Sequence, residues 1–341
     1  MPDLRFPPID LWFGLGGFFP LLLGIAATSE WMVRKPKAGA KVSLRATQII
    51  AGLLALVSSI LFDPQTAFVL LSDQLLTGAL LALALAAISF RFKMLDASGA
   101  IAAFILGTVI FGLGGWPFSV PLLAFFVISN LLSKIHNSKK RRASEGFQKG
   151  SCRDAGQVLA NGGVAGVLVI LWTLDPDPIW YYFYLGAVAA VTADTWATEL
   201  GLFSQATPRL ITTMRPVAAG TSGAVSTLGM LGAAAGAAVI AVLAWIIPLT
   251  QSTIEFRIKG SGVIVVGGIL ASLFDSFLGA TVQAQRICLV CHEKSEKEGV
   301  CCGSTMKTSS GWPWVDNDVV NGACAVCGGL LAALGMGLIQ Q

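Results

Sequence analysis

Long apolar runs separated by short polar stretches dominate the chain. The runs approach the ~20 residues that a helix needs to cross a bilayer, and ten of them fall at residues 11–27, 47–62, 75–90, 98–113, 120–132, 158–174, 180–197, 225–247, 262–282 and 321–339. The third run is the least distinct, because residues 66–72 before it could form an interfacial piece or part of a longer, tilted helix. The pattern predicts an all-α, polytopic integral membrane bundle of about ten transmembrane helices.

The composition favours a membrane protein over a soluble one. Apolar residues make up 55% of the 341 residues and charged residues only 12%, with a mean hydropathy of +0.73. Ordinary soluble domains contain about 25% charged residues. No polar stretch is long enough to form a separate soluble core. The first apolar run lacks a basic segment and a clear cleavage site, so we do not expect a signal peptide.

Lys and Arg are distributed unevenly among the predicted connections. If the N-terminus lies outside, 20 of the 23 basic residues fall in the inner connections 29–46, 91–97, 133–157, 198–224 and 283–320. Basic residues accumulate on the cytoplasmic side of membranes, so we expect these loops to be cytoplasmic. The polar clusters with candidate chemistry, at 133–161, 194–226, 275–286 and 312–321, all fall on that side.

The first polar cluster is SKIHNSKKRRASEGFQKGSCRDAGQVLANGG. The basic run at 139–142 would attract anionic lipid and could serve only as a topological anchor. Downstream, Lys149 and Arg153 flank a glycine, and Gln157 and Asn161 follow at helical spacing. Cationic side chains facing an amide pair would suit a phosphate ester at the membrane surface.

Two carboxylates lie at the end of the apolar run 180–197: Asp194 within the run and Glu199 just after it. Ionisable groups at membrane depth are costly and therefore indicate function, although a carboxylate near a helix end can also simply reach water. Mg²⁺ usually takes one or two carboxylates and completes its shell with phosphate and water. Asp194 and Glu199 are five residues apart, so both reach one ion only if the helix ends or bends between them.

A glycine-rich loop precedes the apolar run at 225–247. The backbone N–H groups of Gly220, Thr221, Ser222 and Gly223 can approach an anion at the N-terminus of the following helix. The loop is not a Walker A motif, because no Gly-Lys-Ser/Thr follows it. A tight turn into glycine-mediated helix packing explains the same residues.

A polar stripe runs along the apolar segment 262–282 and just past it. Asp275, Gly279 and Gln283 repeat every four residues, and Ser276 lies beside them. Residues at this spacing share one helix face. The stripe indicates an interior site rather than a lipid-facing surface.

Four cysteines lie close together in the connection 283–320. Cys288 and Cys291 are followed by His292, and Cys301 and Cys302 come nine residues later. Such a set could bind structural Zn²⁺, although the second pair is adjacent rather than spaced. Thiols without a metal are the alternative; c-type haem attachment also matches this pattern but belongs outside the cytoplasm.

Several segments occur in the order that a known family shows: KMLDASGAIAAFILGTVIF, KKRRASEGFQKGSCRDAGQVLANGG, ADTWATELG, PRLITT, AAGTSGAVS, DSFLGATVQ and NDVVN. In these segments the chain resembles the transmembrane-protein-19 family, or domain of unknown function 92, which includes the phytyl-phosphate kinases of photosynthetic organisms. The resemblance covers residues 91–341 and leaves 1–90 as an N-terminal transmembrane extension. The chain departs from many relatives at Ala193, where they have Gly, and at Thr198, where Ser is usual.

The resemblance implies a membrane-embedded kinase that phosphorylates a prenyl monophosphate from a nucleoside triphosphate at the cytoplasmic face. It implies Mg²⁺ on Asp194, Glu199 and Asp275, with Lys149 and Arg153 on the phosphates. Further substrate and nucleotide contacts are expected from Gln157, Asn161, Gly220, Thr221, Ser222, Gly223 and Gln283. The expected partners are the lipid monophosphate, the nucleotide and membrane lipids, and no nucleic acid.

Two other functions fit the same residues. A cytidylyltransferase-like or other lipid-phosphate transferase would use the same metal and basic side chains and differ in its products. A transporter of an anionic solute would need polar groups that continue across the spans to the outer side. The polar residues cluster on one side instead, which favours an enzyme.

Overall fold

The computed structural model describes residues 73–135, 152–247, 254–291, 294–295 and 300–340. The predicted spans 11–27 and 47–62, the basic run 139–142, Lys149 and His292 therefore lie outside the described residues. The described helices belong to one compact unit, Gln74–Gln341. Only Asp73, the first residue of α4, precedes this unit. The boundary predicted at residue 90 stays a prediction.

Helices make up most of the described chain, in the order α4 (Asp73–Arg91), α5 (Ala97–Lys134), α7 (Ala155–Leu174), α8 (Pro178–Gly201), α9 (Thr227–Ile246), α10 (Ile254–Thr281) and α11 (Asn317–Gln340). Six of these described helices, all except α8, are long and apolar enough to cross a membrane. The all-α membrane bundle is thus confirmed. The count of ten spans stays a prediction, because two of them fall outside the described residues.

Helix α5 contains two of the predicted spans. Its 38 residues exceed the ~20 that one crossing requires. The backbone leaves helical geometry at Gly115, where φ is 63° and ψ is −157°, a conformation that glycine adopts without a Cβ clash. The runs predicted at 98–113 and 120–132 form the two arms on either side of this kink.

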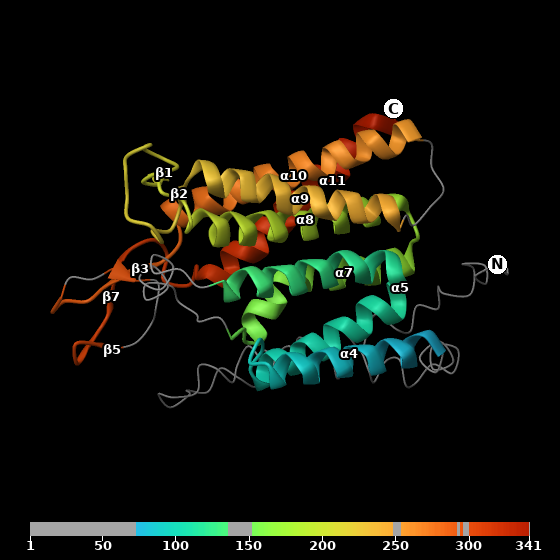
Figure 1. Cartoon of the computed structure of the whole chain (residues 1–341), viewed down its shortest axis with the longest axis horizontal. Coiled ribbons are helices and arrows are strands. Elements are labelled where there is room, and N and C mark those ends of the chain that lie inside the picture. Colours follow the sequence, from blue (N-terminus) through green and yellow to red (C-terminus); the bar gives the residue numbers. More distant parts are fainter. Residues whose placement is uncertain (1–72, 136–151, 248–253, 292–293, 296–299, 341) are drawn as a thin grey trace, which may run out of the picture. The chain divides into compact units, whose positions relative to one another are not determined.

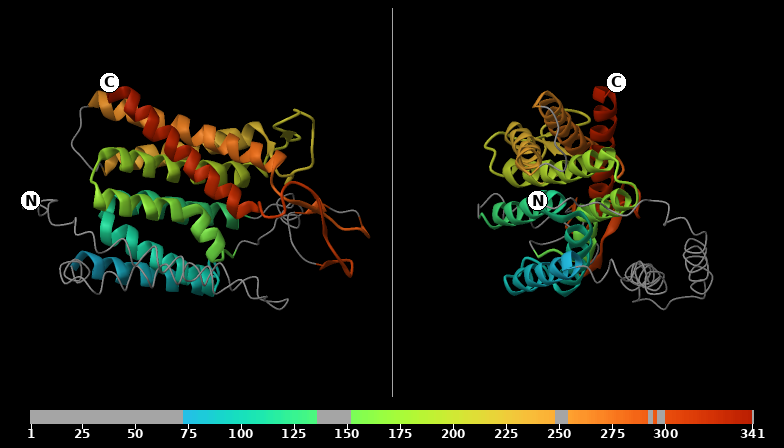
Figure 2. Two further views of the ribbon diagram at one scale, coloured as in Figure 1. Left: turned by 180° about the vertical axis from the view of Figure 1, so that it is seen from behind. Right: turned by 90° about the vertical axis from the view of Figure 1, so that its right-hand side faces the viewer.

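Helix α8 is the central helix and packs against α7, α9, α10 and α11. Its residues from Leu185 to Ala193 are almost all fully buried. Glycines bring its neighbours close: a Cβ on Gly232 of α9 would lie 2.7 Å from the Trp196 carbonyl oxygen, and one on Gly328 of α11 would lie 2.7 Å from that of Gly186. Small residues permit such backbone contact in membrane bundles. Figure 2 shows α11 crossing obliquely over the other helices.

All the described strands lie at one end of the bundle, which we call the loop end (Figure 1). There β1 (Arg209–Leu210) pairs with β2 (Ala224–Val225), and a three-stranded sheet has the order β4 (Lys294–Ser295), β3 (Gln285–Ile287), β7 (Lys307–Ser310). A third pair joins β5 (Val300–Cys301) to β6 (Ser304–Thr305). Strands of two to four residues are too short to show an alternating pattern, so the sequence indicates only loops here.

An aromatic cluster closes the opposite end of the bundle. Phe118 packs at ring-centroid distances of about 5 Å against Trp172, Tyr181 and Tyr184. The Tyr184 hydroxyl donates a hydrogen bond to the Phe118 carbonyl oxygen. Phe118 and Tyr184 are fully buried. This cluster joins α5, α7 and α8 at the end farthest from the strands.

Candidate functional site

A cavity of about 330 Å³ lies at the loop end, between α7, α8, α9, α10, α11 and the loop that carries β1 and β2. Eleven residues that the sequence singles out line it: Arg153, Gln157, Asn161, Asp194, Glu199, Gly220, Thr221, Ser222, Gly223, Asp275 and Gln283. They come from segments up to 130 positions apart, so the fold gathers the polar clusters into one place. The sequence order alone does not imply this.

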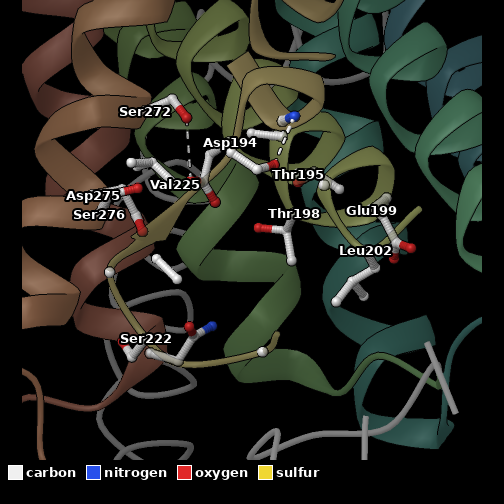
Figure 3. Close-up of a pocket in the computed structure, with 18 of the residues that line it drawn as sticks. Asp194, Thr195, Thr198, Glu199, Leu202, Ser222, Val225, Ser272, Asp275 and Ser276 are labelled. Carbon is white, nitrogen blue, oxygen red and sulfur yellow. Dashed lines mark hydrogen bonds between the residues drawn. The ribbon is translucent and has the colours of Figure 1, made fainter. Parts of the chain in front are cut away.

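Two carboxylates face each other across α8 and α10. The Asp194 carboxyl group interacts directly with that of Asp275, and the Ser272 hydroxyl donates to Asp194 Oδ1 over 3.5 Å. Figure 3 shows these three side chains on one side of the cavity. Two carboxylates at this depth repel each other unless a proton or a cation compensates them. Oxygen donors of this kind suit Mg²⁺.

Glu199 occupies a different part of the cavity from Asp194. Helix α8 runs without a break to Gly201, so five residues rotate the side chains about 140° apart. Figure 3 shows Glu199 on the far side of Thr198 from Asp194. The three predicted metal carboxylates therefore do not form one group: the structure brings Asp194 and Asp275 together and leaves Glu199 apart.

Glu199 lies within electrostatic reach of Arg153 instead. Burial lowers the pKa of the Arg153 guanidinium, and the negative charge of Glu199 opposes that shift. The guanidinium keeps its proton at physiological pH, because arginine does not deprotonate in proteins. Its Cζ atom also lies 5.6 Å from the centre of the Phe125 ring. Among the lining residues that the structure describes, Arg153 thus supplies a fixed positive charge, which Glu199 balances in part.

The backbone holds Arg153 in place through the chain before α5. The Asp96 N–H donates to the Arg153 carbonyl oxygen, and the Arg153 N–H donates to that of Met94, each over 3.0 Å. A Cβ on Gly99 would lie 2.3 Å from the Arg153 oxygen, so this contact requires glycine there. The two segments have similar sequences, Asp-Ala-Ser-Gly and Arg-Asp-Ala-Gly, and in each the aspartate caps the next helix.

Three helices direct their N-termini toward the cavity. Helix α7 contributes Gln157 from its first turn, α9 contributes its N-cap Ser226 with Gly229, and α11 contributes Asn317. Each N-terminus carries about half a positive charge and N–H groups directed outward along the helix. Their convergence favours an anion in the cavity.

The glycine-rich loop forms one wall of the cavity and packs on α10. Gly223 has a φ of 75°, and a Cβ there would lie 2.5 Å from the Ala280 Cβ. The Ser222 hydroxyl donates to Gln283 Oε1 over 2.8 Å. Glycine at 223 is therefore required both by the turn and by helix packing, and the loop also lies where an anion could bind.

Two amide side chains present unsatisfied polar atoms at the cavity. Gln157 Oε1 and Gln283 Nε2 are buried and have no hydrogen-bond partner among the described residues. Gln283 is 3% exposed. Buried polar atoms are nearly always satisfied, so these two atoms mark positions where a bound ligand would supply the missing partner.

Further polar lining residues, all except Ser272, lie within the predicted polar clusters but do not stand out individually as site residues. Asn317 and Asn321 are one helical turn apart at the start of α11, and Ser272 precedes Ser276 by one turn on α10. The four-residue spacing of these polar side chains on apolar helices could have indicated a common face. Ser133, Thr195 and Thr198 complete the polar lining.

The cysteines lie outside the cavity lining. Cys288 follows β3, Cys291 lies in the next turn and Cys302 lies in the turn between β5 and β6. Their three sulfur atoms are all within 4.8 Å of one another. The side chain of Cys301 is not among those that the structure describes.

Comparison with known proteins gives three informative relatives. The chain is 36% identical to Protein PGR of Arabidopsis thaliana over 252 residues, which cover 68% of this chain and 86% of that protein. It is 31% identical to an uncharacterized membrane protein, MJ0933, of Methanocaldococcus jannaschii over 220 residues, 63% of this chain and 85% of that one. It is 25% identical to Protein VTE6, chloroplastic, of Arabidopsis thaliana over 257 residues, 72% and 67% of the two chains.

No solved structure matches the chain. The match to a protein family, by contrast, spans residues 80–329 and thus most of the sequence. It includes every residue of the cavity described above and confirms the resemblance of the seven sequence segments. The chain therefore belongs to the family described as Integral membrane protein DUF92.

Proposed function

We propose that the chain is a kinase that transfers a phosphoryl group from a nucleoside triphosphate to a prenyl monophosphate such as phytyl phosphate. One observation carries the proposal: a carboxylate pair, a buried arginine and three helix N-termini surround a single cavity at one end of a membrane bundle. Phosphoryl transfer depends mainly on positioning and on neutralising phosphate charge. These residues supply both.

Asp194 and Asp275 would hold Mg²⁺, which would neutralise charge on the nucleotide phosphates. The glycine-rich loop and the N-terminus of α9 would bind the same phosphates through backbone N–H groups. Arg153, held by its backbone and by Glu199, would bind the phosphate of the lipid. Gln157 and Gln283 would donate to or accept from the bound phosphates and hydroxyls, which satisfies their buried atoms.

The reaction needs no strong base at the acceptor. A phosphate monoester is already anionic at neutral pH, and one of its oxygens attacks the γ-phosphorus of the nucleotide. The bond from that phosphorus to the β–γ bridging oxygen breaks, and the nucleoside diphosphate leaves with the electron pair. The residues of the cavity then have to align two anions and stabilise the transferred group.

A lipid acceptor fits the position of the cavity. The helices around it expose large apolar side chains, among them Leu231 on α9 and Val266 and Leu270 on α10, as lipid-facing helices do. A polar headgroup at the loop end could therefore enter the cavity while its chain stays in the bilayer. The uneven distribution of Lys and Arg supports a cytoplasmic loop end and an external N-terminus.

A transporter is less well supported by the structure. The polar lining is confined to the loop end, whereas Phe118, Trp172, Tyr181 and Tyr184 fill the opposite end. An anionic solute would meet no continuous polar path through the described bundle. A lipid-phosphate cytidylyltransferase uses similar groups and is separated from a kinase by its products.

The test is a transfer assay with purified protein in detergent and with phytyl and geranylgeranyl monophosphates as acceptors. Nucleotides labelled at the γ or the α position distinguish the reactions. A kinase moves only the γ label into the lipid, whereas a cytidylyltransferase moves the α label and releases diphosphate. Lack of lipid labelling by either nucleotide, in protein that remains folded, would rule out both enzymes. Asp175 is an exposed aspartate at the other end of α7. Its variant Asp175→Asn is the matched control for replacing Asp194 or Asp275.

A further inference from the structure

We propose that Cys288, Cys291 and Cys302 bind a structural Zn²⁺ ion at the loop end. Their sulfur atoms lie within 4.8 Å of one another. Zn–S bonds of about 2.3 Å in a tetrahedral site place neighbouring sulfurs about 3.8 Å apart. The three thiols are therefore close to the spacing that one Zn²⁺ ion requires, and small side-chain rotations complete the approach.

The backbone presents these cysteines from two separate turns. Cys288 directly follows β3, and Cys291 lies in the turn after it. On the hairpin, Val300 pairs with Thr305 and Cys301 with Ser304, which leaves Cys302 and Gly303 as its two-residue turn. Their φ angles are 51° and 75°. This turn type suits a tight hairpin, but a positive φ is strained for a residue with a side chain such as Cys302. Metal binding would offset the conformational free energy that this strain costs.

The donor chemistry favours zinc. Thiolates are soft ligands that select Zn²⁺ over Mg²⁺ or Ca²⁺. Cys288 is fully buried and the other two are exposed, so one ligand anchors the site to the protein and the other two close it from outside. Cys152 and Cys327 belong to other parts of the fold and take no part. No disulfide occurs among the described cysteines.

The metal would connect the hairpin to the segment that shapes the cavity. Gln283 lies two residues before β3, and the neighbouring Ala284 N–H donates to the Val315 carbonyl oxygen over 2.9 Å. A Cβ on Gly311 would lie 2.1 Å from the Gln283 carbonyl oxygen. A clip at Cys288 therefore holds the strand that positions Gln283, and through it Ser222 of the glycine-rich loop.

The direct test is the zinc content of the full-length protein, purified in detergent with Zn²⁺ present and no chelator. Elemental analysis should find about one Zn²⁺ per chain in the wild type and in Cys152→Ser, a control that removes an exposed cysteine elsewhere. Cys291→Ser and Cys302→Ser, both at exposed positions, should each lose most of the metal. Cys288→Ser should do the same, although removing a buried side chain can also impair folding.

Replacement of zinc by Co²⁺ gives a second readout. Tetrahedral thiolate coordination produces visible d–d bands and a sulfur-to-cobalt charge-transfer band, both of which should weaken in Cys302→Ser. Proteolysis should cut within residues 283–316 faster after treatment with a zinc chelator. Metal-free wild type that gives no thiolate bands with Co²⁺, or variants that keep the wild-type zinc content, would overturn the proposal. None of these measurements depends on kinase activity, so the two proposals can fail separately.

Discussion

Asp194 on α8 and Asp275 on α10 bring their carboxyl groups into direct interaction at one end of a membrane bundle. Two helices that meet through small residues make this possible: a Cβ on Gly268 of α10 would lie 3.2 Å from Ala189 of α8. The pair gives the cavity its negative side. Arg153 and the helix N-termini give it a positive side, and this division matches a metal bound next to phosphates.

Under the proposed function, replacing either aspartate should strongly slow phosphoryl transfer. Asp194→Asn and Asp275→Asn should each lower the transfer rate on the order of 10²-fold or more, because a metal ion contributes several kcal/mol of charge stabilisation. The measurement is γ-label transfer to the lipid across a Mg²⁺ titration. Asp175→Asn should keep the wild-type rate. Near-normal activity in one aspartate variant would remove that residue from the metal site.

Arg153 should contribute more than the other arginines at the loop end. Arg153→Gln should cost about 1.5–3 kcal/mol of transition-state stabilisation, as loss of a charged hydrogen bond does. Arg215, which is exposed and does not line the cavity, is the matched control. The comparison is kcat/KM for the lipid phosphate in Arg153→Gln and Arg215→Gln. Equal, small losses would show that the lipid phosphate binds elsewhere.

Glu199 should act through Arg153 rather than through the metal. Glu199→Gln should lower activity less than Asp194→Asn does and leave the Mg²⁺ requirement unchanged. In a double-mutant cycle with Arg153→Gln, the two losses should be far from additive, because the residues interact. Additive losses together with a weakened response to Mg²⁺ would place Glu199 at the metal after all.

Under the proposed function, a lysine at position 153 should make the transfer rate sensitive to alkaline pH. Burial lowers the pKa of the group at this position, because a charged base is disfavoured where water is excluded. The cation exists below the pKa and is lost as pH rises through it. The wild-type arginine stays charged over the whole pH range of the assay. A lysine has an unperturbed pKa of about 10.4, and burial at this position would lower that pKa. A pH–rate profile of Arg153→Lys should therefore fall at alkaline pH where the wild type does not; parallel profiles would contradict this.

The glycine-rich loop should not tolerate a side chain at its contact with α10. Gly223→Ala should reduce nucleotide binding and destabilise the loop by about 1–3 kcal/mol, since its φ is positive and its Cβ would meet α10. A Cβ on Gly262 of α10 would meet nothing within 4 Å, so the control variant Gly262→Ala should be neutral. Nucleotide affinity and thermal unfolding of the two variants give the comparison. A Gly223→Ala protein with wild-type affinity would show that the loop does not bind the nucleotide.

The apolar pattern predicts the bundle well because long hydrophobic runs have few alternatives to crossing a membrane. Polar residues such as Asp194, Asp275 and Gln283 stand out for the same reason, since each is costly among lipid-like neighbours. The direction of Glu199 could not be predicted, because it depends on α8 continuing straight through Thr198. The meeting of Arg153 with the chain before α5, and of three helix N-termini at one cavity, depends on packing between segments that lie far apart in the sequence.

The aromatic cluster at the far end of the bundle has a consequence for the lipid itself. Phe118 and Tyr184 are fully buried there, and the polar lining lies at the loop end, so under the proposed function the acceptor would enter from the membrane leaflet on the loop side. The diphosphate product would have to return to the same leaflet. The protein would thus change the headgroup of a prenyl lipid without flipping it, and any step that uses the product across the bilayer would require a separate flippase.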